Sequence, residues 1–102
     1  MKAKLLQMLG LAMRARKLIS GEDSVIQAVR SGKAKLVLLA TDASANTVKK
    51  VTDKCRYYAV SCHTVCSRYE LGRAIGKEGR VVLAVTDENF ADSIRRLLTP
   101  NP

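Results

Sequence analysis

Two short, continuous apolar runs are the clearest feature of the hydrophobic pattern along this chain. The first covers residues 36–40, after a glycine and two lysines, and ends at the polar residues Thr41 and Asp42. The second covers residues 80–85, where four apolar positions and an alanine follow Arg80. Apolar runs of this length, bounded by polar residues, are typical of strands that are buried on both faces. The pattern therefore predicts a layered protein in which helices cover a sheet.

In the N-terminal third of the chain, apolar residues recur at the spacing of helices. Residues 2–16 carry apolar side chains three or four positions apart, at Leu5, Leu9, Ala12 and Met13, which predicts an amphipathic helix. A second helix is predicted to start at Glu22 and Asp23, whose charge suits the positive end of a helix dipole, and to stop at Gly32.

Capping residues mark three further helices. Ser44 is predicted to cap a third helix, and Ser67 and Glu70 have the spacing of a capping box that would open a fourth helix ending near Gly76. Asp87 is a predicted cap for a last helix, which Pro100 would end. Each start is assigned from a side chain that can accept a hydrogen bond from a free backbone N–H.

Short extended segments complete the pattern. Leu18 and Ile19 form one before Ser20 and Gly21, and residues 57–61 are predicted to form another. The alternation of helices and strands predicts an α/β fold, namely a three-layer α-β-α sandwich with a small mixed sheet. With 102 residues, 47% of them hydrophobic, the chain fits a single domain spanning residues 1–102.

A strong excess of positive charge indicates the kind of partner. The chain has 18 lysines and arginines against 9 acidic residues, a formal net charge of +9. Such an excess on a small surface favours polyanions, with nucleic acid ahead of an anionic membrane. The plain alternative is a small protein that is simply basic.

The N-terminal segment does not have the pattern of a targeting signal. Gln7 interrupts its apolar stretch, Arg14 follows closely, and no small-residue cleavage site is evident. No run approaches the ~20 apolar residues of a membrane span. We therefore expect a cytoplasmic protein without a membrane partner.

Cysteines and the single histidine offer little chemistry. Cys55, Cys62 and Cys66 are an odd number without a paired Cys-x-x-Cys element, which favours reduced thiols. Cys62, His63 and Cys66 lack a nearby fourth ligand for structural zinc, and no nucleophile motif or phosphate-binding glycine loop is present. We predict no metal, no cofactor and no enzyme activity; an enzyme that uses Cys62, His63 and Cys66 is the rival hypothesis.

The junction from Ser20 to Ser24 is the candidate binding element. It opens a helix with free N–H groups, short polar side chains and a glycine that lets another backbone approach. Arg14, Arg16 and Lys17 are expected to lie beside it. An RNA phosphate would be held there while Glu22, Asp23 or Ser24 reads a base edge. Ordinary helix capping explains the same residues more simply.

Two sequence blocks carry a resemblance to a known family. Residues 31–40 followed by Asp42, and the block Glu-Leu-Gly-Arg-Ala-Ile-Gly at 70–76, resemble in order and spacing the kink-turn-binding ribosomal proteins of the L7Ae/L30e type. The similarity covers about residues 16–85 and is closest to the short bacterial members of the YlxQ type. It implies an α-β-α sandwich and a non-catalytic protein that docks on the tandem sheared G·A pairs of an RNA kink-turn.

The resemblance also implies which residues contact the RNA. In the family, the glycine that opens the second helix precedes an Asn, a Glu and a Lys that read guanines; here Gly21 matches, but Asp23, Ser24 and Gln27 stand at those three positions. Because Gln27 lacks a charge and Asp23 repels phosphate, we predict weaker or differently selective RNA binding. Glu22 or Asp23 could supply the missing carboxylate.

A second contact surface is implied by the start of the third helix and the loop before the fourth. These positions are Ser44 and Val48, then Thr64, Val65 and Cys66. Val48 and Val65 would pack on an extruded nucleotide, although a simple core role for Val48 stays open.

The predicted function is that of an RNA-binding protein, monomeric and ribosome-associated, that recognises kink-turn-like structured RNA. The alternative is a protein-interaction module of the translation apparatus with non-specific RNA affinity.

Overall fold

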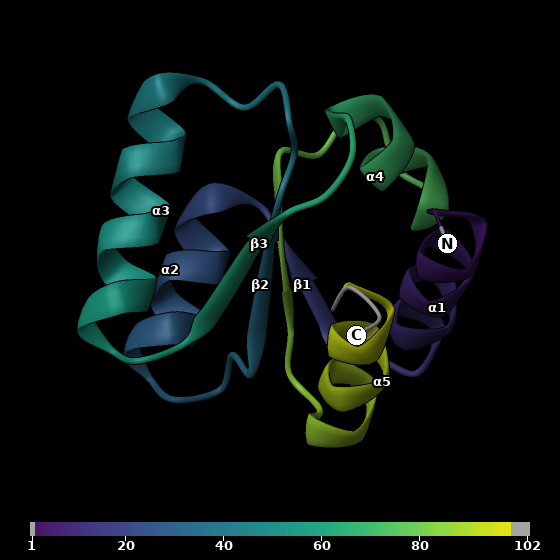
Figure 1. Cartoon of the computed structure of the whole chain (residues 1–102), viewed down its shortest axis with the longest axis horizontal. Coiled ribbons are helices and arrows are strands. Elements are labelled where there is room, and N and C mark those ends of the chain that lie inside the picture. The colour runs from purple at the N-terminus through teal and green to yellow at the C-terminus, as the bar shows by residue number, and fades with distance from the viewer. Residues whose placement is uncertain (1, 99–102) are drawn as a thin grey trace.

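The computed structural model describes residues 2–98 as a sheet with helices on both faces (Figure 1). The elements, in chain order, are α1 (Lys2–Arg14), β1 (Leu18–Ser20), α2 (Glu22–Arg30), β2 (Leu36–Leu39), α3 (Ala45–Tyr57), β3 (Ser61–Thr64), α4 (Arg68–Ala74), β4 (Val82–Val85) and α5 (Glu88–Leu98). Figure 1 shows α2 and α3 on one side of the sheet and α1, α4 and α5 on the other. The predicted three-layer sandwich is confirmed.

The sheet is mixed, and its strand order is β1-β4-β2-β3. β2 and β3 are parallel, with Leu39 beside Thr64, whereas β4 runs antiparallel to both β1 and β2. β4 therefore lies between two strands that come from earlier in the chain. This order makes the ends of β1, β2 and β3 meet at one end of the sheet.

Alternation along β2 supplies both halves of the core. Leu36 and Leu38 pack into the layer of α1, α4 and α5, while Val37 and Leu39 pack into the layer of α2 and α3. All four side chains are at most 1% exposed. The run is thus buried on both faces, as the sequence predicts.

The strand predicted at residues 57–61 is wrong. Tyr57 is the last residue of α3, and the strand that follows is Ser61–Thr64. The helix continues because Val51 and Cys55, one turn apart, pack against the sheet, whereas Tyr57 is 81% exposed. Tertiary packing overrides the β-propensity of the tyrosines.

Three predicted helix caps are confirmed. Ser44 accepts a hydrogen bond from the Thr47 N–H, Ser67 and Glu70 form a capping box, and Asp87 accepts from the Phe90 N–H at 3.0 Å. Pro100 lies outside the described residues. Within residues 2–98, every helix falls short of the length and apolar character that a membrane crossing requires.

Candidate nucleic-acid interface

One end of the sheet brings together three segments that are distant in sequence. β1, β2 and β3 end there and β4 begins there, because Ser20 pairs with Leu83 and Leu39 pairs with both Val82 and Thr64. The segments that follow the three strands therefore meet. We call this end the carboxyl edge; it comprises residues 21–27, 44–48 and 64–65.

Gly21 makes the turn from β1 into α2. Its backbone has φ 101° and ψ 141°, which only glycine adopts without strain, and its N–H donates to the Val82 carbonyl at 3.2 Å. No atom lies within 4 Å of the position that a Cβ would occupy. Gly21 also provides no side-chain cap, so the first N–H groups of α2 stay available to a ligand.

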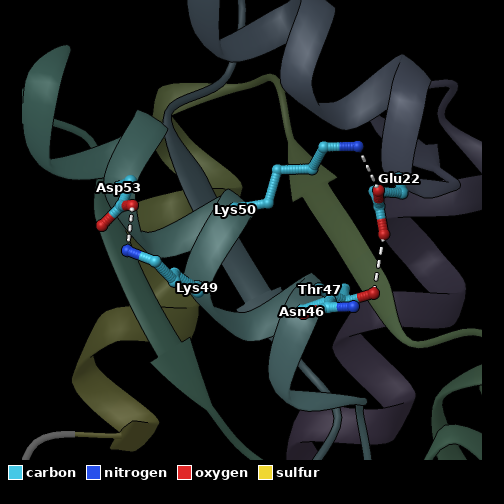
Figure 2. A pocket seen from close by; sticks show the side chains of 6 residues that line it. All are labelled: Glu22, Asn46, Thr47, Lys49, Lys50 and Asp53. Atoms are coloured by element: carbon cyan, nitrogen blue, oxygen red, sulfur yellow. Dashed lines mark hydrogen bonds and ion pairs between the residues drawn. The ribbon is translucent and has the colours of Figure 1, made fainter.

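Glu22 joins α2 to α3 (Figure 2). Its Oε1 accepts a hydrogen bond from the Thr47 hydroxyl at 2.7 Å, and its Oε2 accepts from Lys50 Nζ at 2.9 Å. The Lys50 hydrogen bond, followed by that of Thr47, lowers the pKa of Glu22. Ser44 in turn donates to Thr47 Oγ1. Both oxygens of Glu22 are thus engaged within the protein, and Glu22 links the two helices.

The neighbouring polar residues of α2 are exposed. The side chains of Asp23, Ser24 and Gln27 form no hydrogen bond or ion pair within residues 2–98, although Asp23, after Glu22, contributes to the raised pKa of Lys50. Ser24 and Gln27 are three positions apart and therefore share one side of the helix. The structure thus leaves Asp23, Ser24 and Gln27 accessible at the carboxyl edge.

The expectation that Arg16 and Lys17 lie beside the Ser20–Ser24 junction is wrong. The Lys17 carbonyl accepts a hydrogen bond from the Thr86 N–H just beyond the end of β4, whereas Gly21 bonds to Val82 at the start of β4. β1 is extended, and an extended chain rises about 3.3 Å per residue, so it carries the two ends of this segment apart. Arg16 and Lys17 lie at the opposite end of the sheet.

Of the contact residues that the resemblance implies before α4, Cys66 is buried. Cys66 is only 3% exposed and belongs to the core cluster that also contains Leu71, so its side chain is not on the surface. Thr64 is exposed at the end of β3. Val48 and Val65 are half-buried and pack into core clusters on opposite faces of the sheet.

Cys62 and Cys66 also pack on opposite faces of the sheet. Within residues 2–98, no three His, Cys, Asp or Glu side chains gather in a way that could hold a metal ion. The three cysteines are free thiols.

A carboxylate that was missed as a site-forming residue holds the loop after β2. Asp42 accepts hydrogen bonds from the Arg68 backbone N–H at 2.8 Å and from Arg68 Nε at 3.3 Å, while the Arg68 guanidinium also donates to the Asp42 carbonyl. The backbone hydrogen bond is the main cause of the lowered pKa of Asp42. This contact links the β2–α3 loop to the start of α4.

Thr47 and Lys50 were likewise missed. The signal available in the sequence was their spacing: both lie on the first two turns of the helix that Ser44 caps, three positions apart. Their partner, Glu22, is on another helix, so the spacing alone could not identify it.

Acidification should weaken the contacts that hold the carboxyl edge. The pKa values of Glu22 and Asp42 are lowered in the folded protein, so their contribution to stability is present above the ordinary carboxyl range and is lost as the pH falls below about 4. Glu22→Gln should therefore lower the urea midpoint at pH 7, and the difference from the wild type should shrink toward pH 3. Glu78→Gln, at a carboxylate without an ion pair in residues 2–98, is the control; a gap that stays constant with pH would contradict the assignment.

Comparisons with known proteins find related sequences and folds. The model of the ribosomal protein L7Ae/L30e/S12e/Gadd45 family matches residues 3–95. The chain is 63% identical over 91 residues to the RNA-binding protein YlxQ of Bacillus subtilis (strain 168), which covers 89% of this chain and 91% of that protein.

Two solved structures share the fold. A protein of unknown function from Bacillus halodurans superimposes with a TM-score of 0.92 at 47% identity, covering 94% of this chain and 97% of that one. A 15.5 kD RNA-binding protein from Giardia lamblia superimposes with a TM-score of 0.82 over 94% and 82% of the two chains. At 21% identity, the second likeness concerns the fold alone.

Proposed function

Because the chain belongs to the ribosomal protein L7Ae/L30e/S12e/Gadd45 family, we propose that it is an RNA-binding protein that recognises a kink-turn-like bend in structured RNA. It docks through the carboxyl edge and stabilises the bent form by binding it in preference to the extended form. The RNA belongs to the ribosome or to another structured RNA of the cytoplasm.

The observation that carries this proposal is the convergence of three loop-to-helix segments at one end of the sheet. The family resemblance implies contacts from the start of α2 and the start of α3, and the hydrogen bonds of Glu22 to Thr47 and Lys50 hold these two helix starts together. RNA loops and distorted pairs expose base edges that such a rigid, polar edge can read.

Each exposed residue of the edge has a distinct role in this proposal. The first N–H groups of α2 donate to a phosphate, which can come close because Gly21 has no Cβ to keep an RNA backbone away. Ser24 and Gln27 contact guanine edges from one side of α2. Ser44 and Thr64 flank the nucleotide that leaves the bend.

A titration with two matched RNAs tests the proposal. One contains a kink-turn, and the other has the same length and charge but its tandem G·A pairs are replaced by Watson–Crick pairs. We expect the kink-turn RNA to bind at least about tenfold more tightly at the same salt concentration, because both RNAs share the phosphate contribution and only one presents the bend. Fluorescence anisotropy at several salt concentrations measures both affinities. Equal affinity would contradict kink-turn recognition and leave only charge.

A further inference from the structure

The end of the sheet opposite the carboxyl edge carries an unusual concentration of positive charge. α1, α2 and α3 all end there, as Figure 1 shows, and β2 and β3 start there. Eight basic residues lie in these helix ends and the loops that follow them: Arg14, Arg16, Lys17, Arg30, Lys33, Lys35, Lys54 and Arg56. We call this set the basic face.

Hydrogen bonds along the strand ends place its central lysines. The Lys17 carbonyl accepts from the Thr86 N–H at 2.9 Å, and the Lys35 N–H donates to the Val85 carbonyl at 2.8 Å. Lys17 and Lys35 therefore flank the end of β4 on its two sides, about 10 Å apart at the spacing of neighbouring strands. The basic face thus continues across the sheet instead of forming separate patches.

The positive charges of the basic face are not neutralised by the protein. None of its eight residues forms an ion pair within the described chain, whereas Lys2, Lys49, Lys50 and Arg68 elsewhere do. The nearby acidic residues are engaged: Asp87 caps α5, and Glu88 and Asp92 pair with Arg95. Compensation of the helix dipoles accounts for the cations in the last turns of the helices. It does not account for Arg16, Lys17, Lys33 and Lys35, which lie in loops.

An exposed aromatic pair adjoins these cations. Tyr57 and Tyr58, at the end of α3, follow Arg56 directly; their rings are 4.9 Å apart in an edge-to-face arrangement, and Tyr57 is 81% exposed. The Tyr57 ring contacts Tyr58 and is still largely open to solvent. Exposed aromatic rings among lysines and arginines are the combination that binds unpaired nucleic acid, because bases stack on the rings while the cations hold the phosphates.

We propose that the basic face is a second RNA-binding surface, which holds a single-stranded segment with one base stacked on Tyr57. The proposal rests on the proposed function, because the same RNA would supply both the bend and the unpaired segment. With the carboxyl edge on the bend and the basic face at the opposite end of the strands, separated by the length of α3, about 20 Å at 1.5 Å per helical residue, one protein joins two parts of a folded RNA.

The test uses a fluorescent uridine dodecamer and the full chain, free or saturated with a short kink-turn duplex. We expect the dodecamer to bind both forms with affinities within about threefold of each other. Tyr57→Ala should weaken this binding about tenfold and Tyr57→Phe should not, because phenylalanine keeps the stacking surface. Lys33→Gln combined with Lys54→Gln should make the dependence of log affinity on log salt shallower by about 1.4, since each phosphate contact to a single strand contributes about 0.7 to its steepness.

A matched control and separate titrations keep the outcomes distinct. Lys4→Gln combined with Lys77→Gln removes the same charge from exposed lysines away from the basic face and should leave dodecamer binding unchanged. An equal loss in this control, displacement of the dodecamer by the kink-turn duplex, or unchanged binding by Tyr57→Ala would overturn the proposal. So would binding to phosphatidylserine vesicles without binding to the dodecamer. Failure of the proposed function would appear instead as equal affinity for the bent and Watson–Crick duplexes, with dodecamer binding to the free protein intact.

Discussion

Replacing Gly72 by alanine is expected to lower the free energy of unfolding by about 3 kcal/mol. Gly72 is buried in α4, and the loop that follows the helix folds back over it, with the Lys77 N–H donating to the Gly72 carbonyl at 2.8 Å. A Cβ at this position would overlap the Glu78 carbonyl oxygen and lie 2.6 Å from its carbon. Because these are backbone atoms, the loop itself would have to move.

Thermal unfolding measures this effect, and the chain contains its own control. We expect the melting temperature of Gly72→Ala to fall by about 15 °C, from the usual relation between stability and melting temperature in a chain of this size. Gly79→Ala should change it little, since a Cβ there would meet only the flexible Arg68 side chain, at 3.4 Å. A Gly72→Ala protein that melts within about 3 °C of the wild type would show that the loop moves away without cost.

Restoring the family residues on α2 is expected to increase the affinity for kink-turn RNA about a hundredfold. The variant combines Asp23→Asn, Ser24→Glu and Gln27→Lys, three exposed positions whose replacement breaks no hydrogen bond or ion pair in residues 2–98. Gln27→Lys replaces a neutral hydrogen-bond donor to guanine by a charged donor. Ser24→Glu supplies a carboxylate that accepts from the N–H groups of guanine. Hydrogen bonds to charged groups contribute about 1.5–3 kcal/mol each, so two of them account for a gain of this size.

The kink-turn RNA and its Watson–Crick counterpart distinguish recognition of the bend from electrostatic attraction to any RNA. The triple variant raises the net charge by one, and Glu78→Gln does the same away from α2. The gain should be confined to the kink-turn RNA, and Glu78→Gln should change the affinities for both RNAs by a small and equal factor. An equal gain for the Watson–Crick duplex would assign the effect to charge, and no gain at all would contradict the placement of α2 against the guanines.

The sequence predicted the elements better than it predicted the site. The buried run of β2, the capping residues Ser44 and Ser67, and the α-β-α layers follow from periodicity and local hydrogen bonding, which act between neighbours in the chain. The strand at residues 57–61 failed because packing of α3 against the sheet, a contact between distant segments, decided where the helix ends. In the sequence, Gly72 was only part of a pattern shared with the family. The structure shows why a glycine stands there, because the backbone of the loop after α4 leaves no room for a Cβ.

Within the site, too, features set by neighbours in the chain were predicted from the sequence, and features set by distant segments were not. Gly21 and the first turn of α2 were identified because a glycine before a helix has a local meaning. Cys66 is buried in the core, and Glu22 connects α2 to α3. Both features depend on which distant segments pack together in the fold. Glu22 reaches partners 25 and 28 positions away, and no local pattern records such a pairing.

By itself, then, the sequence determined the fold class, the family and the positive charge of this protein, because each is expressed in the spacing or number of residues along the chain. Only the tertiary structure decided where that charge lies. Arg16 and Lys17 are close to Gly21 in sequence, but the extended β1 between them carries them to the far end of the sheet, where they join cations from the ends of α2 and α3. Strand order and direction, which set these long-range neighbours, depend on the packing of the whole domain.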